Sequence, residues 1–153
     1  MSSVSSTHQE ERVHPPADLG LVDALAQLSF LVQGALAERA ATHDLSMIQT
    51  RLLGILRDRQ PTMQELARLL ALDKSSVTGL IDRAEKRGLV QRTPSKNDRR
   101  TIYVMLTSAG RRAIAHVGRG FQADMASATQ CLSAADKKRL STLATKIISH
   151  YAI

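Results

Sequence analysis

The chain has 153 residues, 43% of them hydrophobic and 23% charged, which suits one globular domain with its own core. Its single cysteine, Cys131, excludes an internal disulfide and agrees with a reducing compartment. The net charge of +7 favours a polyanionic partner, whereas 3% aromatic residues and no tryptophan disfavour stacking on single-stranded nucleic acid.

The N-terminal segment, residues 1–17, is rich in serine and ends in Pro15-Pro16. This composition predicts a flexible arm. Some of its side chains are possible metal ligands, but no partner segment of defined geometry accompanies them, so we expect no metal site. These side chains are His8, Glu10, Glu11 and His14.

Two long amphipathic helices are predicted near the ends of the chain. Apolar residues recur at helical spacing from Leu19 to His43, and Ser133 with Asp136 forms a capping-box pattern that starts a helix reaching Tyr151. We expect these terminal helices to pack together. They either close the core of a single chain or join their counterparts in a second subunit.

Neither a membrane span nor a signal peptide is expected. Asp23, Gln27 and Gln33 interrupt the most apolar stretch, and the chain does not open on a positively charged and then apolar leader. The sequence therefore predicts a soluble, cytoplasmic protein.

Shorter helices are predicted in the middle of the chain. Ser46 and Gln49 form one capping-box pattern, and Thr62 and Glu65 form another. A further helix is expected to start at Thr107 or Ser108 and to run to about residue 130. The Thr62 helix and the helix that follows Asp73 are separated by about three residues, which is typical of a helix-turn-helix.

The helix from Asp73 to Gly88 is predicted to have two different faces. Asp73 suits the N-cap and Gly88 the position just past the C-terminus. The face predicted to be buried carries Val77, Leu80, Ile81 and Ala84. The opposite face is polar and partly cationic, and it suits close approach to duplex DNA or simply a solvated surface. It carries Ser75, Gly79, Asp82 and Lys86, flanked by Ser76, Thr78 and Arg83.

A basic hairpin is predicted next, from Leu89 to Thr107. Ile102, Val104 and Leu106 alternate with Thr101, Tyr103 and Met105 in the period of a half-buried strand. A basic hairpin tip suits a narrow, electronegative minor groove, although an ordinary charged turn has the same composition. The tip carries Lys96, Asp98, Arg99 and Arg100. We expect the Asp98 carboxylate to hold the Arg100 guanidinium extended.

The positive charge is concentrated on these two elements. Residues 73–112 contain ten Lys and Arg against four acidic residues, whereas residues 1–72 contain six against eight and residues 113–153 contain five against two. Charge gathered on one predicted surface indicates a polyanion. Duplex DNA is favoured over an anionic membrane because the basic segment includes a hairpin rather than one basic amphipathic helix.

The segment DKSSVTGLIDRAEKRGLVQRTPSKNDRRTIYVMLTSAGR, residues 73–111, resembles the MarR family of dimeric winged helix-turn-helix transcription regulators. The resemblance is carried by the helix that ends in Gly88-Leu89-Val90, the Asp98-x-Arg100 wing and the following Leu106-Thr107-x-x-Gly110-Arg111. Weaker similarity extends over roughly residues 19–151. It implies a sequence-specific regulator, expected to be a repressor, that binds a palindromic operator as a homodimer and is released by a small anionic or aromatic ligand.

The resemblance implies a mainly α fold with a small β hairpin, in three parts. These are a flexible arm (1–17), a helical dimerisation region (18–45 and 108–153) and a winged helix-turn-helix lobe (46–107). The implied DNA-binding residues are Lys74, Ser75, Ser76, Thr78, Gly79, Arg83, Lys86, Lys96, Asp98, Arg99 and Arg100. The implied dimer interface contains Leu21, Leu25, Leu28, Leu140, Leu143, Ile147 and Tyr151.

An effector site is also implied, in a crevice between the dimerisation helices and the DNA-binding lobe. His43, Gln49 and Arg51 lie near the expected junction and offer partners for an anion, although surface and capping roles suit them too. Some relatives sense oxidants through a cysteine near the start of the first dimerisation helix, but this chain has none there. Cys131 is instead expected to be a buried structural thiol.

Alternative functions are a small enzyme and a basic protein-interaction module without DNA affinity. Gly118-x-Gly120-x-x-Ala123 imitates a dinucleotide-binding fingerprint, but it lies within a predicted helix and follows no strand. The histidines are scattered, and no nucleophile elbow or paired-carboxylate cluster occurs. We therefore expect no catalytic site and no cofactor.

Overall fold

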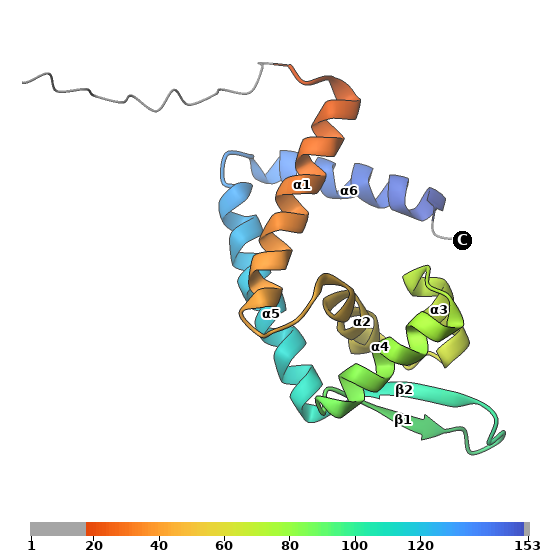
Figure 1. The fold of residues 1–153 in the computed structure, drawn as a ribbon. Coiled ribbons are helices and arrows are strands. Elements are labelled where there is room, and N and C mark those ends of the chain that lie inside the picture. Colours follow the sequence, from red (N-terminus) through yellow and green to blue (C-terminus); the bar gives the residue numbers. More distant parts are fainter. Residues whose placement is uncertain (1–17, 152–153) are drawn as a thin grey trace, which may run out of the picture.

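The computed structural model describes residues 18–151, so the predicted N-terminal arm and its candidate metal ligands lie outside the described residues. Six helices and one antiparallel pair of strands make up this part of the chain (Figure 1). They are α1 (Gly20–Ala41), α2 (Met47–Asp58), α3 (Met63–Leu70), α4 (Lys74–Lys86), β1 (Val90–Pro94), β2 (Ile102–Leu106), α5 (Ser108–Ala128) and α6 (Ala134–Tyr151). The predicted fold class, mainly helical with one small hairpin, is confirmed.

Short polar side chains start the helices where the sequence predicts. Ser46 and Gln49 form a complete capping box at the start of α2, and Thr62 and Glu65 form another at the start of α3. Thr107 caps α5 through its hydroxyl. Each cap satisfies backbone N–H groups that have no partner within the helix, and a typical cap stabilises a helix by about 0.5–2 kcal/mol.

The core lies where α2, α3, α4 and α5 meet the hairpin. The face of α4 predicted to be buried is at most 1% exposed, at Val77, Leu80, Ile81 and Ala84. Residues 71–73 join α3 to α4, which confirms the helix-turn-helix. The other buried side chains of this cluster include Leu52, Leu53, Leu56, Leu66, Leu70, Val90, Val104, Leu106, Ile114 and Val117.

Within the single chain, α1 packs chiefly along α5, so the alternative in which the two terminal helices close the core of one chain is wrong. In the last turn of α1, the Arg39 guanidinium donates to both carboxylate oxygens of Asp124, at 2.6 and 2.5 Å. Gly120 makes room for this side chain, because a Cβ there would lie 2.8 Å from Arg39 Cδ. Gly120, which belongs to the stretch that imitates a dinucleotide-binding fingerprint, therefore allows α1 and α5 to pack closely.

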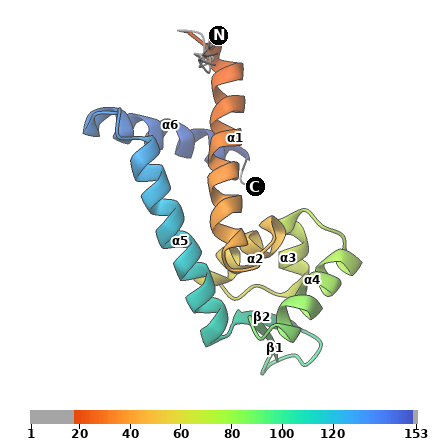
Figure 2. The same cartoon turned by 60° about the vertical axis from the view of Figure 1, so that its left-hand side comes forward.

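Helix α6 turns back from the end of α5 and runs across the direction of α1, at the end of the molecule away from the wing, in both orientations of the ribbon (Figures 1 and 2). None of its described residues is buried, so α6 does not close the core of its own chain. Cys131, in the link between α5 and α6, is exposed, and the expectation of a buried thiol is wrong. The link reverses the chain beyond the end of the core, where no element covers it.

Both α1 and α6 expose large apolar side chains. The residues predicted for the dimer interface are all at least 41% exposed, namely Leu21, Leu25, Leu28, Leu140, Leu143, Ile147 and Tyr151. By length and composition alone, α1 is also apolar enough to cross a membrane, with a mean hydropathy of 1.4 in its best window. The interruptions at Asp23, Gln27 and Gln33 therefore do not exclude a span by themselves.

Gly110, in the first turn of α5, is the position where a methyl group would disturb the fold most. A Cβ there would lie 2.0 Å from the carbonyl oxygen of Leu89 and 3.1 Å from Leu106 Cδ2. We expect Gly110→Ala to lower the free energy of unfolding by about 1–3 kcal/mol, as overpacking typically does. Gly118→Ala is the matched control in the same helix, since no atom lies within 4 Å of its Cβ position. Thermal unfolding of both variants checks this, and an unchanged melting temperature for Gly110→Ala would contradict it.

Candidate nucleic-acid interface

Helix α4 is held at both ends by local features. The Asp73 carboxylate accepts from the Ser76 N–H at 2.9 Å and from the hydroxyls of Ser75 and Ser76, both at 2.6 Å. The hydrogen bonds from the two serine hydroxyls, and then from the Ser76 N–H, hold the pKa of Asp73 well below its usual range. Gly88 follows the helix with a φ of 68°, the left-handed conformation expected of a residue just past a helix C-terminus.

The polar face of α4 points away from the core. Ser75, Ser76 and Thr78 are exposed and Gly79 is half-buried. All three hydroxyls already donate within the helix, because Thr78 bonds the Lys74 carbonyl at 2.9 Å while the serines bond Asp73. A hydroxyl that donates keeps its acceptor lone pairs. In this conformation these side chains therefore offer acceptors to a ligand.

The wing pairs β1 with β2 in a register that runs from Val90 opposite Leu106 to Pro94 opposite Ile102. Tyr103 also forms an isolated bridge with Thr62, so the segment before α3 docks onto the free edge of β2. The sequence did not predict this bridge between Thr62 and Tyr103. The bridge fixes the wing to the start of the helix-turn-helix.

The turn of the wing is shaped by Asp98, but not in the predicted way. One oxygen of its carboxylate accepts from the Arg100 backbone N–H at 2.9 Å, and the other accepts from the Thr101 hydroxyl at 3.3 Å. The expected brace between the carboxylate and the Arg100 guanidinium is therefore wrong. The carboxylate is turned inward to the backbone of the tight turn, so it fixes the loop and leaves the arginine side chain to project from it.

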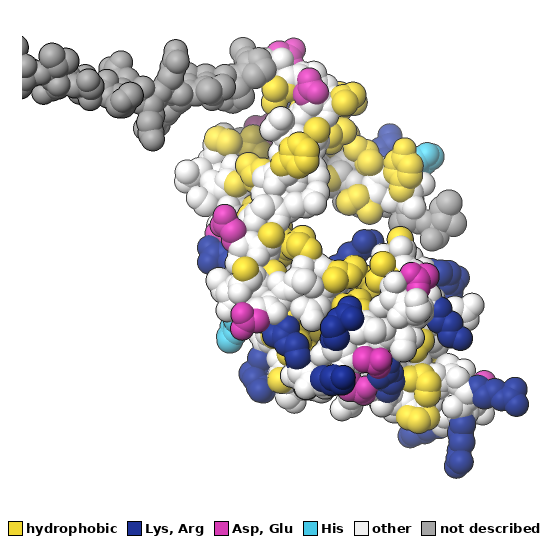
Figure 3. Space-filling model, viewed as in Figure 1, with side chains coloured by type: hydrophobic (Ala, Val, Ile, Leu, Met, Phe, Trp, Pro, Cys, Tyr) yellow, Lys and Arg dark blue, Asp and Glu magenta, His cyan; other side chains and the backbone are white. Residues whose placement is uncertain are grey.

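The cations of this surface carry most of their charge uncompensated. Within residues 18–151, the only basic side chains in ion pairs are Arg39, Arg57 and Arg92. The predicted DNA-binding cations are all exposed and belong to none of these pairs: Lys74, Arg83, Lys86, Lys96, Arg99 and Arg100. Lys and Arg gather on the lower part of the molecule, over α4 and the wing, and apolar side chains on the upper part (Figure 3).

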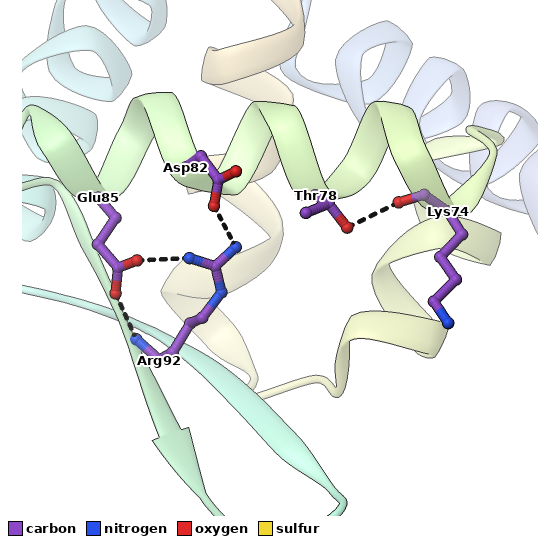
Figure 4. Close-up of polar contacts among 5 residues, drawn as sticks. All are labelled: Lys74, Thr78, Asp82, Glu85 and Arg92. Carbon is purple, nitrogen blue, oxygen red and sulfur yellow. Dashed lines mark hydrogen bonds and ion pairs between the residues drawn. The ribbon is translucent and has the colours of Figure 1, made fainter.

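Arg92 of β1 is a residue of this surface that the sequence did not single out. Its guanidinium bridges two carboxylates of α4, at 2.6 Å from Asp82 and 2.5 Å from Glu85 (Figure 4). Partial burial by itself lowers the pKa of Arg92, but the hydrogen bonds to Asp82 and Glu85 outweigh it, and the net pKa is raised. The sequence feature that could have predicted this contact is the pair of acidic residues on the preceding helix, Asp82 and Glu85, which are three positions apart.

A groove of about 630 Å³ lies between the wing, the start of α3 and the first turns of α4. Its lining includes Lys74 and Thr78 from α4 and Arg92 and Arg100 from the wing side. Hydroxyl and cationic groups thus meet in one concave surface. Such a surface is complementary to a phosphate backbone.

The three candidate effector residues do not surround one site. Arg51 lines a cavity of about 770 Å³ between α1, α2 and α5, together with Arg57, Arg59 and apolar side chains. Its guanidinium also donates to the Leu69 carbonyl at 3.1 Å. His43 and Gln49 are not part of this lining.

His43 and Gln49 lie instead at the junction of α1 and α2, where Arg87 reaches from the end of α4. The Arg87 guanidinium donates to the Asp44 carbonyl at 2.6 Å, the His43 carbonyl at 3.3 Å and Gln49 Oε1 at 3.4 Å. The His43 ring stacks on His116 of α5 at 5.5 Å. These contacts tie α4 to the scaffold helices.

Comparisons with known proteins agree with this geometry. Residues 43–101, which contain the helix-turn-helix and the start of the wing, match the model of the MarR family. The apo structure of MarR from Escherichia coli superposes with a TM-score of 0.66 at 27% identity, covering 80% of this chain and 96% of MarR.

Two curated relatives are named as transcriptional regulators. The transcriptional repressor NicR of Pseudomonas putida is 38% identical over 48% of this chain and 47% of its own length. The regulator FarR of Neisseria gonorrhoeae is 30% identical over 69% of this chain and 70% of its own length. The similarity thus spans about half of NicR and more than two thirds of FarR. With the helix-turn-helix, the wing and the overall superposition in common, the chain belongs to the MarR family of DNA-binding transcriptional regulators.

Proposed function

We propose that the chain is a cytoplasmic, homodimeric repressor that places α4 in the major groove and the wing in the adjacent minor groove of a palindromic operator. The observation that carries this proposal is the row of six exposed cations on α4 and the wing that form no ion pair within residues 18–151. The name of NicR supports repression as the direction of regulation.

The residues have different roles in this proposal. Lys74, Arg83 and Lys86 neutralise phosphates on either side of the major groove, and Gly79 allows close approach of the helix. At the tip of the wing, Lys96, Arg99 and Arg100 enter or flank the minor groove, and Asp98 shapes the turn that presents them.

Base readout falls to Ser75, Ser76 and Thr78. Because their hydroxyl protons are engaged by Asp73 and the Lys74 carbonyl, the three side chains present lone pairs to the groove. The amino groups of cytosine and adenine are the donors in the major groove. We therefore infer a preference for these bases opposite the start of α4.

The dimer is proposed to form through residues 18–45 and 108–153, with residues 46–107 as the DNA-binding lobe. The exposed apolar faces of α1 and α6 support this division, because contiguous apolar surface of this kind marks an interaction site. We favour a second copy of the chain, rather than a lipid bilayer, as the partner that covers these apolar faces. The faces lie on two separate helices, and residues 137–139 of α6 are Lys-Lys-Arg, which would be costly to place in the hydrocarbon core of a bilayer.

Selection from random duplex DNA, combined with sedimentation of the protein at micromolar concentration, tests the proposal. We expect a palindromic site with half-sites about one helical turn apart, roughly 10 base pairs. A monomer that shows no preference among duplexes would contradict both the dimer and the specific site.

We further propose that a small aromatic or anionic molecule binds in the cavity between α1, α2 and α5. Apolar residues such as Leu36, Ile55 and Phe121 line its walls, and the guanidinium of Arg51 supplies a partner for an anion. A ligand can favour a spacing between the DNA-binding lobes of the two subunits that does not fit the operator. Such a ligand weakens DNA binding, and DNA lowers the affinity for the ligand by the same factor.

Thermal unfolding against a panel of aromatic carboxylates, phenolics and antibiotics, with and without operator DNA, tests this second proposal. We expect one class to raise the melting temperature and to weaken operator binding, with both effects reduced in Arg51→Ala. Arg68→Ala is the matched control, because Arg68 is outside the cavity lining. A panel without any such compound would remove the support for ligand control.

A further inference from the structure

Arg92 connects the wing to the recognition helix through three hydrogen bonds. Its guanidinium donates to Asp82 Oδ1 at 2.6 Å and to Glu85 Oε2 at 2.5 Å, and its backbone N–H donates to Glu85 Oε1 at 3.2 Å (Figure 4). The planar guanidinium therefore spans two carboxylates on one side of α4. Lysine, a point charge on a flexible stem, cannot reproduce this fork.

The cluster of Arg92, Asp82 and Glu85 is partly shielded from solvent. The Arg92 side chain is 27% exposed, and those of Asp82 and Glu85 are 50% and 39% exposed. A single exposed ion pair contributes little to stability, but a shared guanidinium with defined geometry holds its partners more firmly. No other ion pair within residues 18–151 joins the wing to α4.

The charge of the cluster does not favour DNA. Two carboxylates and one guanidinium leave a net charge of −1, next to the groove that Lys74 and Arg100 also line. The direct electrostatic effect of the cluster on a phosphate backbone is therefore repulsive. Any benefit to DNA binding has to come from the position that it gives to α4 and the wing.

We propose that Arg92 is a positioning residue for DNA binding, which locks the wing at a fixed angle to α4 so that both reach their grooves together. This inference rests on the proposed function. Preorganisation lowers the entropy that binding costs, and it matters most for a site contacted by two elements at once. It predicts that the acidic residues help specific binding although they repel DNA.

The test uses the double variant Asp82→Asn, Glu85→Gln in the full chain. Removing two negative charges is expected to strengthen binding to random duplex DNA. If the cluster positions the wing, the variant nevertheless binds the selected operator about tenfold more weakly, the order of magnitude expected for a coupled network. Hydrogen exchange of the β1 and β2 amides should become faster at the same time.

Asp58→Asn is the matched control. Asp58 also forms an ion pair with an arginine, but its partner is the adjacent Arg57 at the end of α2, so the pair joins no two elements. We expect unchanged operator specificity and unchanged exchange in the wing. Arg92→Lys should resemble the double variant in operator binding, because it keeps the charge and loses the fork.

The outcomes separate this inference from the proposed function. If the unmodified protein prefers no duplex, the proposed function fails. If it binds an operator and the double variant binds that operator equally well or more tightly, the positioning role is wrong. If the double variant does not fold, operator binding by the single variant Asp82→Asn tests the same role. This variant keeps both hydrogen bonds from Arg92 to Glu85.

Discussion

Replacing Arg100 with alanine is expected to weaken binding to the operator by about 1–3 kcal/mol, or roughly 5-fold to 150-fold. Arg100 is exposed at the tip of the wing, and its guanidinium forms no ion pair within residues 18–151. Its backbone N–H is held by Asp98, so the turn presents the side chain at a fixed place. A narrow minor groove attracts such an arginine more strongly than bulk solvent does.

Two further variants distinguish recognition of the operator sequence from general electrostatic attraction to DNA. Lys86→Ala should weaken operator and random duplexes about equally, and each lost phosphate contact should reduce the slope of log affinity against log salt by about 0.9. Arg57→Ala is the charge-matched control, since Arg57 is paired with Asp58 outside the α4 and wing surface. Equal salt slopes for the unmodified protein, Arg100→Ala and Lys86→Ala would exclude this surface as the DNA contact.

The parts of the fold predicted correctly from the sequence are those that depend on neighbours in the chain. The capping box of Thr62 and Glu65 involves residues three apart, and the buried face of α4 follows from helical periodicity. The alternation at Val104 and Leu106 follows from the pleat of a strand. Patterns of this kind involve residues close together in the chain, so they can be read from the sequence alone.

The contacts that were missed join residues on different helices or strands. Arg39 and Asp124 are 85 positions apart, and their pairing depends on how α1 lies across α5 at Gly120. The bridge from Arg92 to Asp82 depends on the register of the hairpin and on its docking against α4. Composition and periodicity do not encode these relative positions.

For the candidate interface, the sequence indicated which residues are exposed but not how their polar atoms are used. The Asp98 carboxylate was expected to hold the Arg100 side chain, but the tight turn brings it to backbone and hydroxyl donors first. The hydroxyls of Ser75 and Ser76 lie close enough to Asp73 to be engaged by it. Short polar side chains near a helix start commonly satisfy local partners in this way.

Breaking the apolar faces of α1 and α6 is expected to have the largest effect on operator binding. In the double variant Leu25→Glu, Leu143→Glu, a charged carboxylate would have to be buried on each of two helices in the proposed dimer, which is costly unless each charge is paired. Both residues are exposed in the single chain, at 48% and 60%, so the lobe itself should stay folded. We expect a species of 16.7 kDa in sedimentation instead of one of twice that mass.

Operator affinity should fall by about 10²-fold or more in this variant, because a monomer binds one half-site and loses the gain from two linked contacts. Thr145→Glu is the matched control. It adds the same charge to α6, but helical spacing places Thr145 on the side opposite Leu143, and its side chain is also exposed. A dimer that persists in the double variant would show that other residues hold the subunits together. Full operator affinity in a monomeric variant would show that one lobe is enough for recognition.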